Sequence, residues 1–145
     1  MKTRLIEILM IEDDMDDVIL TREALKSAKI GNTISVVRDG EEALAFLRKQ
    51  PPHAGAVRPD LILLDLSLPK LDGREVLKEI RKDASLCAIP VVVLSASDDR
   101  DDILKSYELN ANSFVTKPVN FERFREVIQS IDNYWFGVVQ LPSET

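Results

Sequence analysis

The feature that most constrains this chain is a short, uniformly apolar run, Leu61–Leu64, which ends directly at Asp65. A strand that faces water on one side alternates apolar and polar residues, whereas a strand covered on both faces is apolar throughout. We therefore predict a central parallel strand whose C-terminal tip carries a carboxylate. Other short apolar runs alternate with segments of helical periodicity, which is typical of an α/β fold with helices on both faces of a parallel sheet.

Five strands and five helices account for nearly the whole pattern. The strands are expected at Ile6–Ile11, Thr33–Val37, Leu61–Leu64, Pro90–Leu94 and Ser113–Thr116. The helices are expected at about Asp16–Ala28, from Gly40 to about Leu47, at about Gly73–Lys82, at about Asp98–Leu109 and from about Asn120 onward. The segment from Gln50 to Pro59 is rich in proline and contains His53, which is typical of an exposed loop.

Length and composition narrow the class of protein. With 145 residues, the chain has the length of one domain, and its formal net charge of −6 disfavours a direct nucleic-acid partner. No apolar run approaches the roughly 20 residues that span a bilayer, so no membrane partner is expected. The N-terminus lacks a secretory signal, and the single cysteine, Cys87, cannot close an internal disulfide and is expected to pack as a small apolar residue. We expect a cytoplasmic protein without an output domain.

Polar residues stand at the predicted C-terminal ends of four strands. Glu12 and Asp13 follow the first, Asp65 the third, Ser95 the fourth and Lys117 the fifth. Each alone has an ordinary explanation, such as a helix cap or a turn. In open parallel sheets, however, ligands bind outside these strand ends, and carboxylates gathered there repel one another unless they are protonated or a cation neutralises them. Mg²⁺ prefers oxygen ligands, so Asp13 and Asp65 are candidate direct ligands and Glu12 a ligand through water.

The same residues suggest phosphoryl chemistry. Carboxylates can act as covalent nucleophiles that form aspartyl phosphate, and Asp65 is the candidate nucleophile. Lys117 offers a cation for a carboxylate at rest and for a phosphoryl oxygen after transfer, and Ser95 offers a hydroxyl donor.

A set of short motifs, each from a different strand end or the loop after it, now resembles a known family. The motifs are Glu12-Asp13, Leu64-Asp65, Leu68-Pro69, Asp72-Gly73, Ser95-Ala96 and Lys117-Pro118. Together they resemble the receiver domain of two-component response regulators over about residues 5–132. The resemblance implies one receiver domain over residues 1–145, with residues 133–145 as a C-terminal extension. It also implies a flavodoxin-like, doubly wound, five-stranded parallel sheet of order 2-1-3-4-5 with five helices.

The resemblance also assigns roles to individual residues. It makes Asp65 the phosphoacceptor, Asp13, Asp65 and the backbone carbonyl of Ser67 the Mg²⁺ ligands, and Glu12 an outer acidic partner of the metal.

Three further residues match the family's switch and its salt-bridging lysine. Ser95 is similar to the switch hydroxyl, Phe114 to the aromatic switch residue, and Lys117 to the salt-bridging lysine. The alternative interpretation of Phe114 is a plain core phenylalanine in a strand.

Further segments resemble a subgroup, the single-domain response regulators of cyanobacterial phytochromes. These segments are Leu66–Leu77, the extended loop before the third strand and Tyr134–Phe136. The resemblance implies a signalling protein, not an enzyme, phosphorylated by a histidine kinase of phytochrome type, with a histidine phosphotransfer protein as a further candidate partner. The aromatic residues Trp135 and Phe136 suggest a homodimer contact through the C-terminal face, although they could instead cover their own core.

Two other functions stay open from the sequence. A Mg²⁺-dependent aspartate-based phosphatase would need a second aspartate where this chain has Ser67. A receiver-shaped interaction module that is never phosphorylated would not need the full acidic and lysine set. Because His53 lies in a loop and not on an exposed helix, the donor histidine is expected to belong to another protein.

Overall fold

The computed structural model describes residues 6–27, 31–95, 111, 113–117, 122 and 126. Its strands are β1 (Ile6–Ile11), β2 (Asn32–Val37), β3 (Leu61–Asp65), β4 (Val91–Ser95) and β5 (Ser113–Thr116). Its helices are α1 (Met15–Ser27), α2 (Gly40–Leu47) and α3 (Gly73–Lys82). All neighbouring strands are parallel, in the order β2-β1-β3-β4-β5, which confirms the predicted sheet.

The elements match the predicted ones to within two residues at each described end. β3 and β4 each extend one residue further than predicted, so Asp65 and Ser95 belong to the hydrogen-bonded ladder. The helix expected at Asp98–Leu109 and the tail from residue 133 lie outside the described residues. Of the helix expected from Asn120, the described residues Glu122 and Glu126 are helical and exposed.

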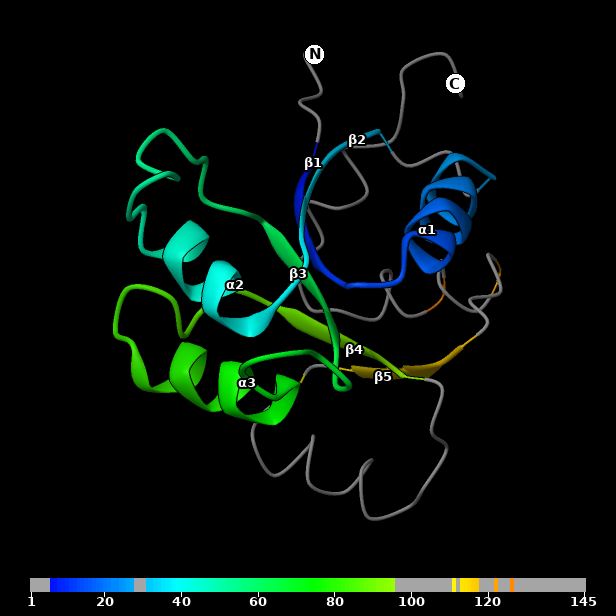
Figure 1. The fold of residues 1–145 in the computed structure, drawn as a ribbon. Coiled ribbons are helices and arrows are strands. Elements are labelled where there is room, and N and C mark those ends of the chain that lie inside the picture. The colour runs from blue at the N-terminus through cyan, green and yellow to red at the C-terminus, as the bar shows by residue number, and fades with distance from the viewer. Residues whose placement is uncertain are drawn as a thin grey trace.

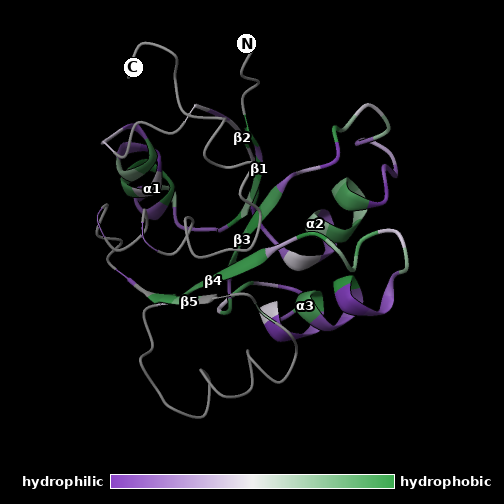
Figure 2. Cartoon of the chain, turned by 180° about the vertical axis from the view of Figure 1, so that it is seen from behind, coloured by the Kyte–Doolittle hydropathy of each residue, from purple (hydrophilic) through white to green (hydrophobic). Residues whose placement is uncertain are grey.

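Helices cover both faces of the sheet, with α1 on one face and α2 and α3 on the other (Figure 1). Successive strand residues point to opposite faces, so each strand contributes to two cores. Ile8 and Met10 of β1 pack with Val18 and Leu25 of α1. The opposite core gathers alternate residues of β1, β3 and β4 with the apolar sides of α2 and α3. In Figure 2 the strands are mainly hydrophobic, and α3 is hydrophilic on the side that faces away from the sheet.

The inner strands are buried over their whole length. Every residue of β3 and β4 is buried, as the uniformly apolar run Leu61–Leu64 predicts. Cys87 corrects one expectation: it is exposed, because it lies in the turn before β4 while its neighbours Leu86 and Ile89 fill the core.

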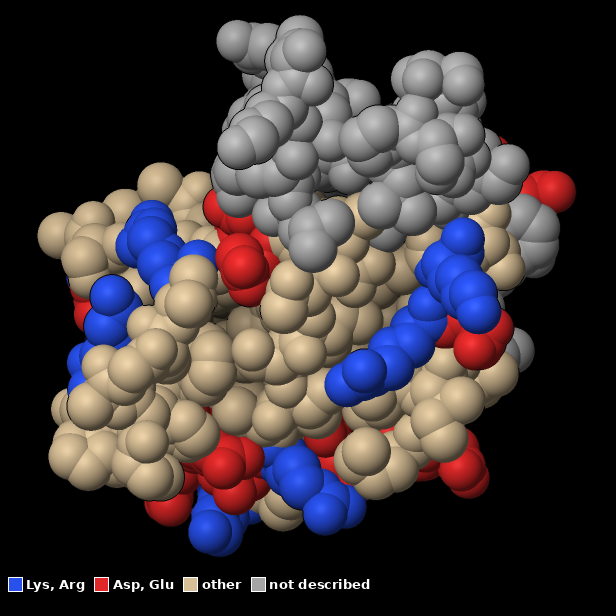
Figure 3. Space-filling view, turned by 90° about the horizontal axis from the view of Figure 1, so that it is seen from above, with Lys and Arg blue, Asp and Glu red and all other residues tan. Residues whose placement is uncertain are grey.

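Charge is mixed on the face of the molecule shown in Figure 3, where basic and acidic side chains are interspersed with large uncharged areas. The described residues in this view form no broad basic surface of the kind that binds a phosphate backbone. In the described part of the chain, no helix has the length and apolar character needed to cross a membrane.

The start of α2 lies very close to the loop between β3 and α3. Asp39 caps the helix, because its side chain accepts a hydrogen bond from the Glu42 N–H at 2.8 Å. The next residue must be small, since a Cβ at Gly40 would overlap the backbone carbonyl oxygen of Leu71. This close approach fixes the loop that follows Asp65 against α2.

We predict that Gly40→Ala lowers the free energy of unfolding by about 2 kcal/mol, because the backbone of α2 or of the loop must move to admit the methyl group. Gly55→Ala is the matched control, since nothing lies within 4 Å of a Cβ there. It should change stability by less than about 0.5 kcal/mol. Urea unfolding of both variants measures the difference, and equal stabilities would contradict the close contact.

Candidate metal and phosphoacceptor site

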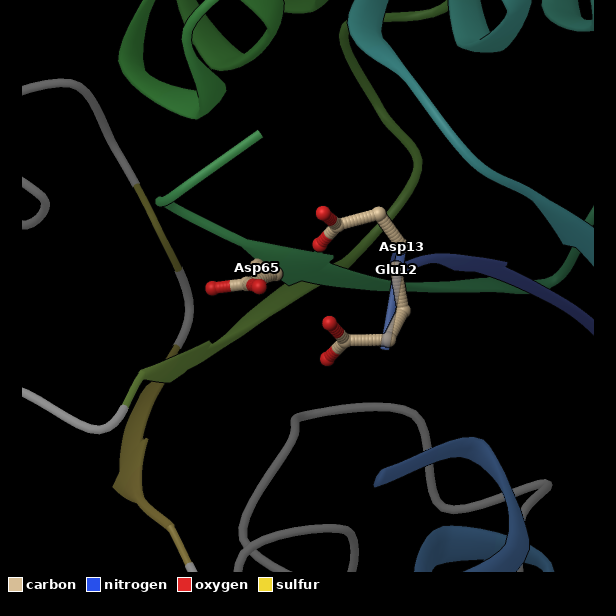
Figure 4. Close-up of side chains that lie close together, drawn as sticks. All are labelled: Glu12, Asp13 and Asp65. Carbon is tan, nitrogen blue, oxygen red and sulfur yellow. The ribbon is translucent and has the colours of Figure 1, made fainter. Parts of the chain in front are cut away.

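Three carboxylates meet where β1 and β3 end. Glu12 and Asp13 directly follow β1, Asp65 is the last residue of β3, and these two strands are neighbours in the sheet. One oxygen from each side chain lies within 4.8 Å of the others, and Figure 4 shows the three side chains gathered at this edge. Glu12 and Asp65 are buried, with exposed fractions of 1% and 6%, whereas Asp13 is exposed.

Lys117 brings a cation to these carboxylates from the other end of the sheet. Its Nζ atom lies 2.5 Å from Glu12 Oε1, 2.8 Å from Asp17 Oδ2 and 3.4 Å from Asp65 Oδ2. In the sheet, β4 and β3 separate β5 from β1, so a long side chain is needed to make these contacts. The backbone fixes its starting point, because the Lys117 N–H donates to the Ser95 carbonyl oxygen at 2.8 Å.

The proximity of these groups changes their affinity for protons. Burial raises the pKa of Glu12 to about 7, although the hydrogen bond from Lys117 acts in the opposite direction. Burial alone would lower the pKa of Lys117, but its hydrogen bonds to Asp17 and Glu12 and the charge of Asp65 hold it above its ordinary value. The lysine is therefore protonated at neutral pH and offsets part of the negative charge.

The Asp65 side chain is held by the loop that follows it. Its Oδ1 atom accepts a hydrogen bond from the Ser67 N–H at 3.1 Å, while Oδ2 faces Lys117. The loop then turns back, and the Gly73 N–H donates to the Leu66 carbonyl oxygen at 3.1 Å. A Cβ at Gly73 would overlap the backbone carbonyl oxygen of Asp65, so this tight return requires glycine.

Ser67, Ser95 and Phe114 lie near this edge in different settings. Ser67 is exposed and adjoins the site through its backbone N–H. Ser95 is buried at the end of β4. Phe114 is also buried, pairs with Val93 across the sheet and packs in the core beneath α2 and α3. This position agrees with a core phenylalanine, and the switch role assigned to it stays a prediction.

Asp17 is a site residue that the sequence analysis missed. It lies in the first turn of α1, four residues after Asp13, and makes a 2.8 Å ion pair with Lys117. A possible signal was its place in the first helical turn after the acidic loop. The neighbouring Asp14 caps α1, because its Oδ1 atom accepts a hydrogen bond from the Asp16 N–H at 2.9 Å.

The residues present fit a hard divalent cation. Glu12, Asp13 and Asp65 offer carboxylate oxygens, the ligands that Mg²⁺ and Mn²⁺ prefer, and the exposed side of Asp13 leaves access for water and phosphate oxygens. Glu12, Asp17 and Asp65 contact the single ammonium group of Lys117, and Asp13 adds a fourth acidic side chain at the same edge, so acidic groups outnumber the cation there.

Comparison with known proteins shows the family to which this chain belongs. The family model for the response regulator receiver domain matches residues 8–129. The chain belongs to this family. Response regulator Rcp1 of Synechocystis sp. is 45% identical over 136 residues, which cover 94% of this chain and 92% of that protein.

Two solved receiver structures are similar over nearly their whole length. The Mn²⁺-bound form of response regulator Rcp1 has a TM-score of 0.77 and 44% identity, covering 94% of this chain and 99% of that one. The phosphorylated cyanobacterial phytochrome response regulator RcpA has a TM-score of 0.79 and 45% identity, covering 96% of this chain and 99% of that one.

We predict that Lys117→Met destabilises this receiver in EDTA by about 2 kcal/mol, because the buried carboxylates lose their cation. Mg²⁺ should then stabilise the variant more than the wild type, since a divalent ion binds more tightly to an uncompensated acidic cluster and stabilises by mass action. Thermal unfolding with and without Mg²⁺ measures both effects. Lys26→Met, at the exposed end of α1, is the control, and an equal Mg²⁺ effect in all three proteins would contradict the electrostatic account.

Proposed function

We propose that this receiver accepts a phosphoryl group on Asp65 from a partner histidine kinase and signals through protein contacts that depend on phosphorylation. The observation that carries this proposal is the convergence on Asp65. A carboxylate at the tip of the central strand faces Lys117 at 3.4 Å and shares an oxygen cluster with Glu12 and Asp13. Phosphoryl transfer depends mainly on such positioning and charge neutralisation.

In the proposed step, a carboxylate oxygen of Asp65 forms a bond to phosphorus as the bond from phosphorus to the donor's histidine nitrogen breaks. The donor nitrogen leaves with the electron pair. When bound, Mg²⁺ supplies positive charge that neutralises the phosphoryl oxygens. Asp13, Asp65 and the Ser67 carbonyl would hold the ion, with Glu12 acting through water.

Three residues would respond to the new group. Lys117 already faces Asp65 and can pair with a phosphoryl oxygen. Ser95 ends the neighbouring strand and would donate its hydroxyl to another oxygen. Ser95 pairs with Thr116 across the sheet, and Phe114 lies two residues before Thr116. Phe114 would change its side-chain position after Ser95 moves, as the aromatic switch residue.

The phosphoryl donor is proposed to be a kinase of phytochrome type, on the likeness to the RcpA structure. The chain's own histidine is poorly placed as a donor. The His53 ring packs against Phe46 with centroids 5.4 Å apart, and its Nε2 atom is buried 3.6 Å from Glu42 Oε2. This nitrogen would have to become accessible before it could carry a phosphoryl group.

Several narrower predictions remain proposals. They are the core at about residues 5–132, the extension at 133–145, the homodimer through the C-terminal face, the downstream phosphotransfer protein and the cytoplasmic location. Tyr134, Trp135 and Phe136, on which the homodimer rests, lie outside the described residues.

The two alternatives find less support. An unphosphorylated interaction module would bury Glu12 and Asp65 beside Lys117 at an electrostatic cost without using them. An aspartate-based phosphatase would need a general acid two residues after Asp65, where the exposed Ser67 stands.

Incubation with acetyl phosphate and Mg²⁺ should add the mass of one phosphoryl group to the intact wild-type protein. Asp65→Asn should remove the adduct, and EDTA should suppress it, because both the nucleophile and charge neutralisation are needed. Asp16→Asn is the matched control, since Asp16 is an exposed carboxylate at the same edge. A folded wild type that forms no adduct, or an adduct that survives in Asp65→Asn, would contradict the proposal.

The kinase is proposed to contact α1. Met15, Ile19 and Leu20 on this helix are each roughly half exposed, and the helix starts directly after the acidic loop. Exposed apolar residues grouped beside a site indicate a protein contact. Ile19→Glu should slow phosphotransfer from a phosphorylated phytochrome-type kinase at least tenfold, by roughly 1.4 kcal/mol or more.

The same variant should react with acetyl phosphate at the wild-type rate, because the phosphoacceptor itself is unchanged. Val57→Glu, in the exposed loop before β3, is the control for a charge placed on an exposed apolar residue. Rapid-quench measurement gives the rate of phosphotransfer from the kinase to each variant. Equal rates for Ile19→Glu and Val57→Glu would contradict a kinase contact on α1.

A further inference from the structure

Arg38 is a second cation at the acidic edge, and its backbone is fixed there. It directly follows β2, whose last residue, Val37, accepts a hydrogen bond from the Glu12 N–H at 2.9 Å. The Arg38 N–H donates to Glu42 Oε1 at 2.9 Å, and Glu42 is itself held by the capping Asp39. The base of the arginine side chain is therefore anchored beside the end of β1, which Glu12 and Asp13 directly follow.

The guanidinium group of Arg38 extends over the rim of the site. Its Nη2 atom lies 3.5 Å from the backbone carbonyl oxygen of Asp13, and the side chain is exposed. Within the described ranges, no carboxylate lies within ion-pair distance of it, so its positive charge is uncompensated by a partner. Most of its N–H donors remain available for an incoming anion.

The other cations at this edge differ from Arg38 in this respect. Lys117 is enclosed by three carboxylates. Lys70, in the loop after Asp65, lies 3.6 Å from Asp39 Oδ2. Among these three cations, Arg38 is the one without a carboxylate partner in the described residues. Its guanidinium N–H donors face solvent beside Asp13, a candidate metal ligand.

An anion that approaches Asp65 meets the exposed carboxylates of Asp13, Asp14 and Asp16. These charges repel a phosphoryl donor before it can reach the buried nucleophile, and rim charges mainly affect encounter and affinity. A guanidinium group binds phosphate oxygens through two parallel hydrogen bonds, which gives both attraction and orientation.

We propose that Arg38 binds the anionic end of small phosphoryl donors at the rim and selects dianionic acyl phosphates over donors of lower charge. This inference rests on the proposed function of Asp65 and names the donor class that its rim favours. During transfer, a bond forms between an Asp65 oxygen and phosphorus while the bond from phosphorus to the acyl oxygen breaks. The carboxylate leaving group departs with the electron pair, and Arg38 takes part in binding only.

The test measures phosphorylation rates of the full chain against donor concentration at saturating Mg²⁺. Acetyl phosphate, a dianion, is compared with phosphoramidate, a monoanion, for wild type, Arg38→Ala, Arg38→Lys and Arg38→Glu. Arg38→Ala should raise the half-saturating concentration of acetyl phosphate about fivefold, from the loss of one charge near a doubly charged donor. The maximal rate should stay unchanged, and phosphoramidate should show a smaller effect.

Charge and geometry are separated by the remaining variants. Arg38→Lys should recover most of the affinity, Arg38→Glu should weaken it further, and the differences should shrink at an ionic strength of about 0.5 M. Lys26→Glu, at the far end of α1, makes the same change in net charge as Arg38→Glu and should leave both donors unaffected.

The inference is overturned if Arg38→Ala and Arg38→Glu keep the wild-type affinity for acetyl phosphate. It is also overturned if they lower the maximal rate or the Mg²⁺ affinity instead, which would assign Arg38 a purely structural role through the Asp13 carbonyl. A wild type that forms no adduct with either donor would defeat the proposed function itself, which is a distinct result.

Discussion

One ammonium group holds the acidic edge of this receiver together. Glu12 and Asp65 are buried, and two carboxylates at such a distance repel each other unless one is protonated or a cation lies close to both. Lys117 forms ion pairs with both carboxylates and also with Asp17. The ends of β1, β3 and β5 and the start of α1 must therefore keep their relative positions for these charges to be balanced. A phosphoryl group on Asp65 would add charge at the point where Lys117 already lies.

Close backbone contacts hold Asp65 in the orientation in which its side chain faces this lysine. Gly73 lets the chain return over the Asp65 carbonyl, and Gly40 lets α2 pack on Leu71 in the same loop. Lys70, between them, adopts a left-handed backbone with φ of 65°, which costs a non-glycine residue about 1 kcal/mol or more. The loop is therefore held from two sides, and packing on α2 stabilises a strained segment beside Asp65.

Much of the fold and site could be predicted, because short apolar runs indicate buried strands and their alternation with helical segments indicates that the strands are parallel. The apolar run before Asp65 indicated a covered strand, and parallel strands place Glu12, Asp13, Asp65 and Lys117 at one edge. The sheet order came from the family resemblance, since the pairing of distant strands is not encoded in local periodicity. Asp17 was missed because its contact depends on the rotation of α1 about its axis. The exposure of Cys87 likewise depends on the course of one turn.

The most direct test of the account is to locate the phosphoryl group within the chain. Borohydride reduces an aspartyl phosphate to homoserine, so reduction of the phosphorylated protein followed by peptide sequencing in a mass spectrometer marks the acceptor. We predict homoserine at position 65 and at no other aspartate, with none formed when Mg²⁺ is removed by EDTA. Homoserine at Asp13 or Asp17, or a stable phosphate on Ser67, would contradict the assignment of Asp65 as the phosphoacceptor.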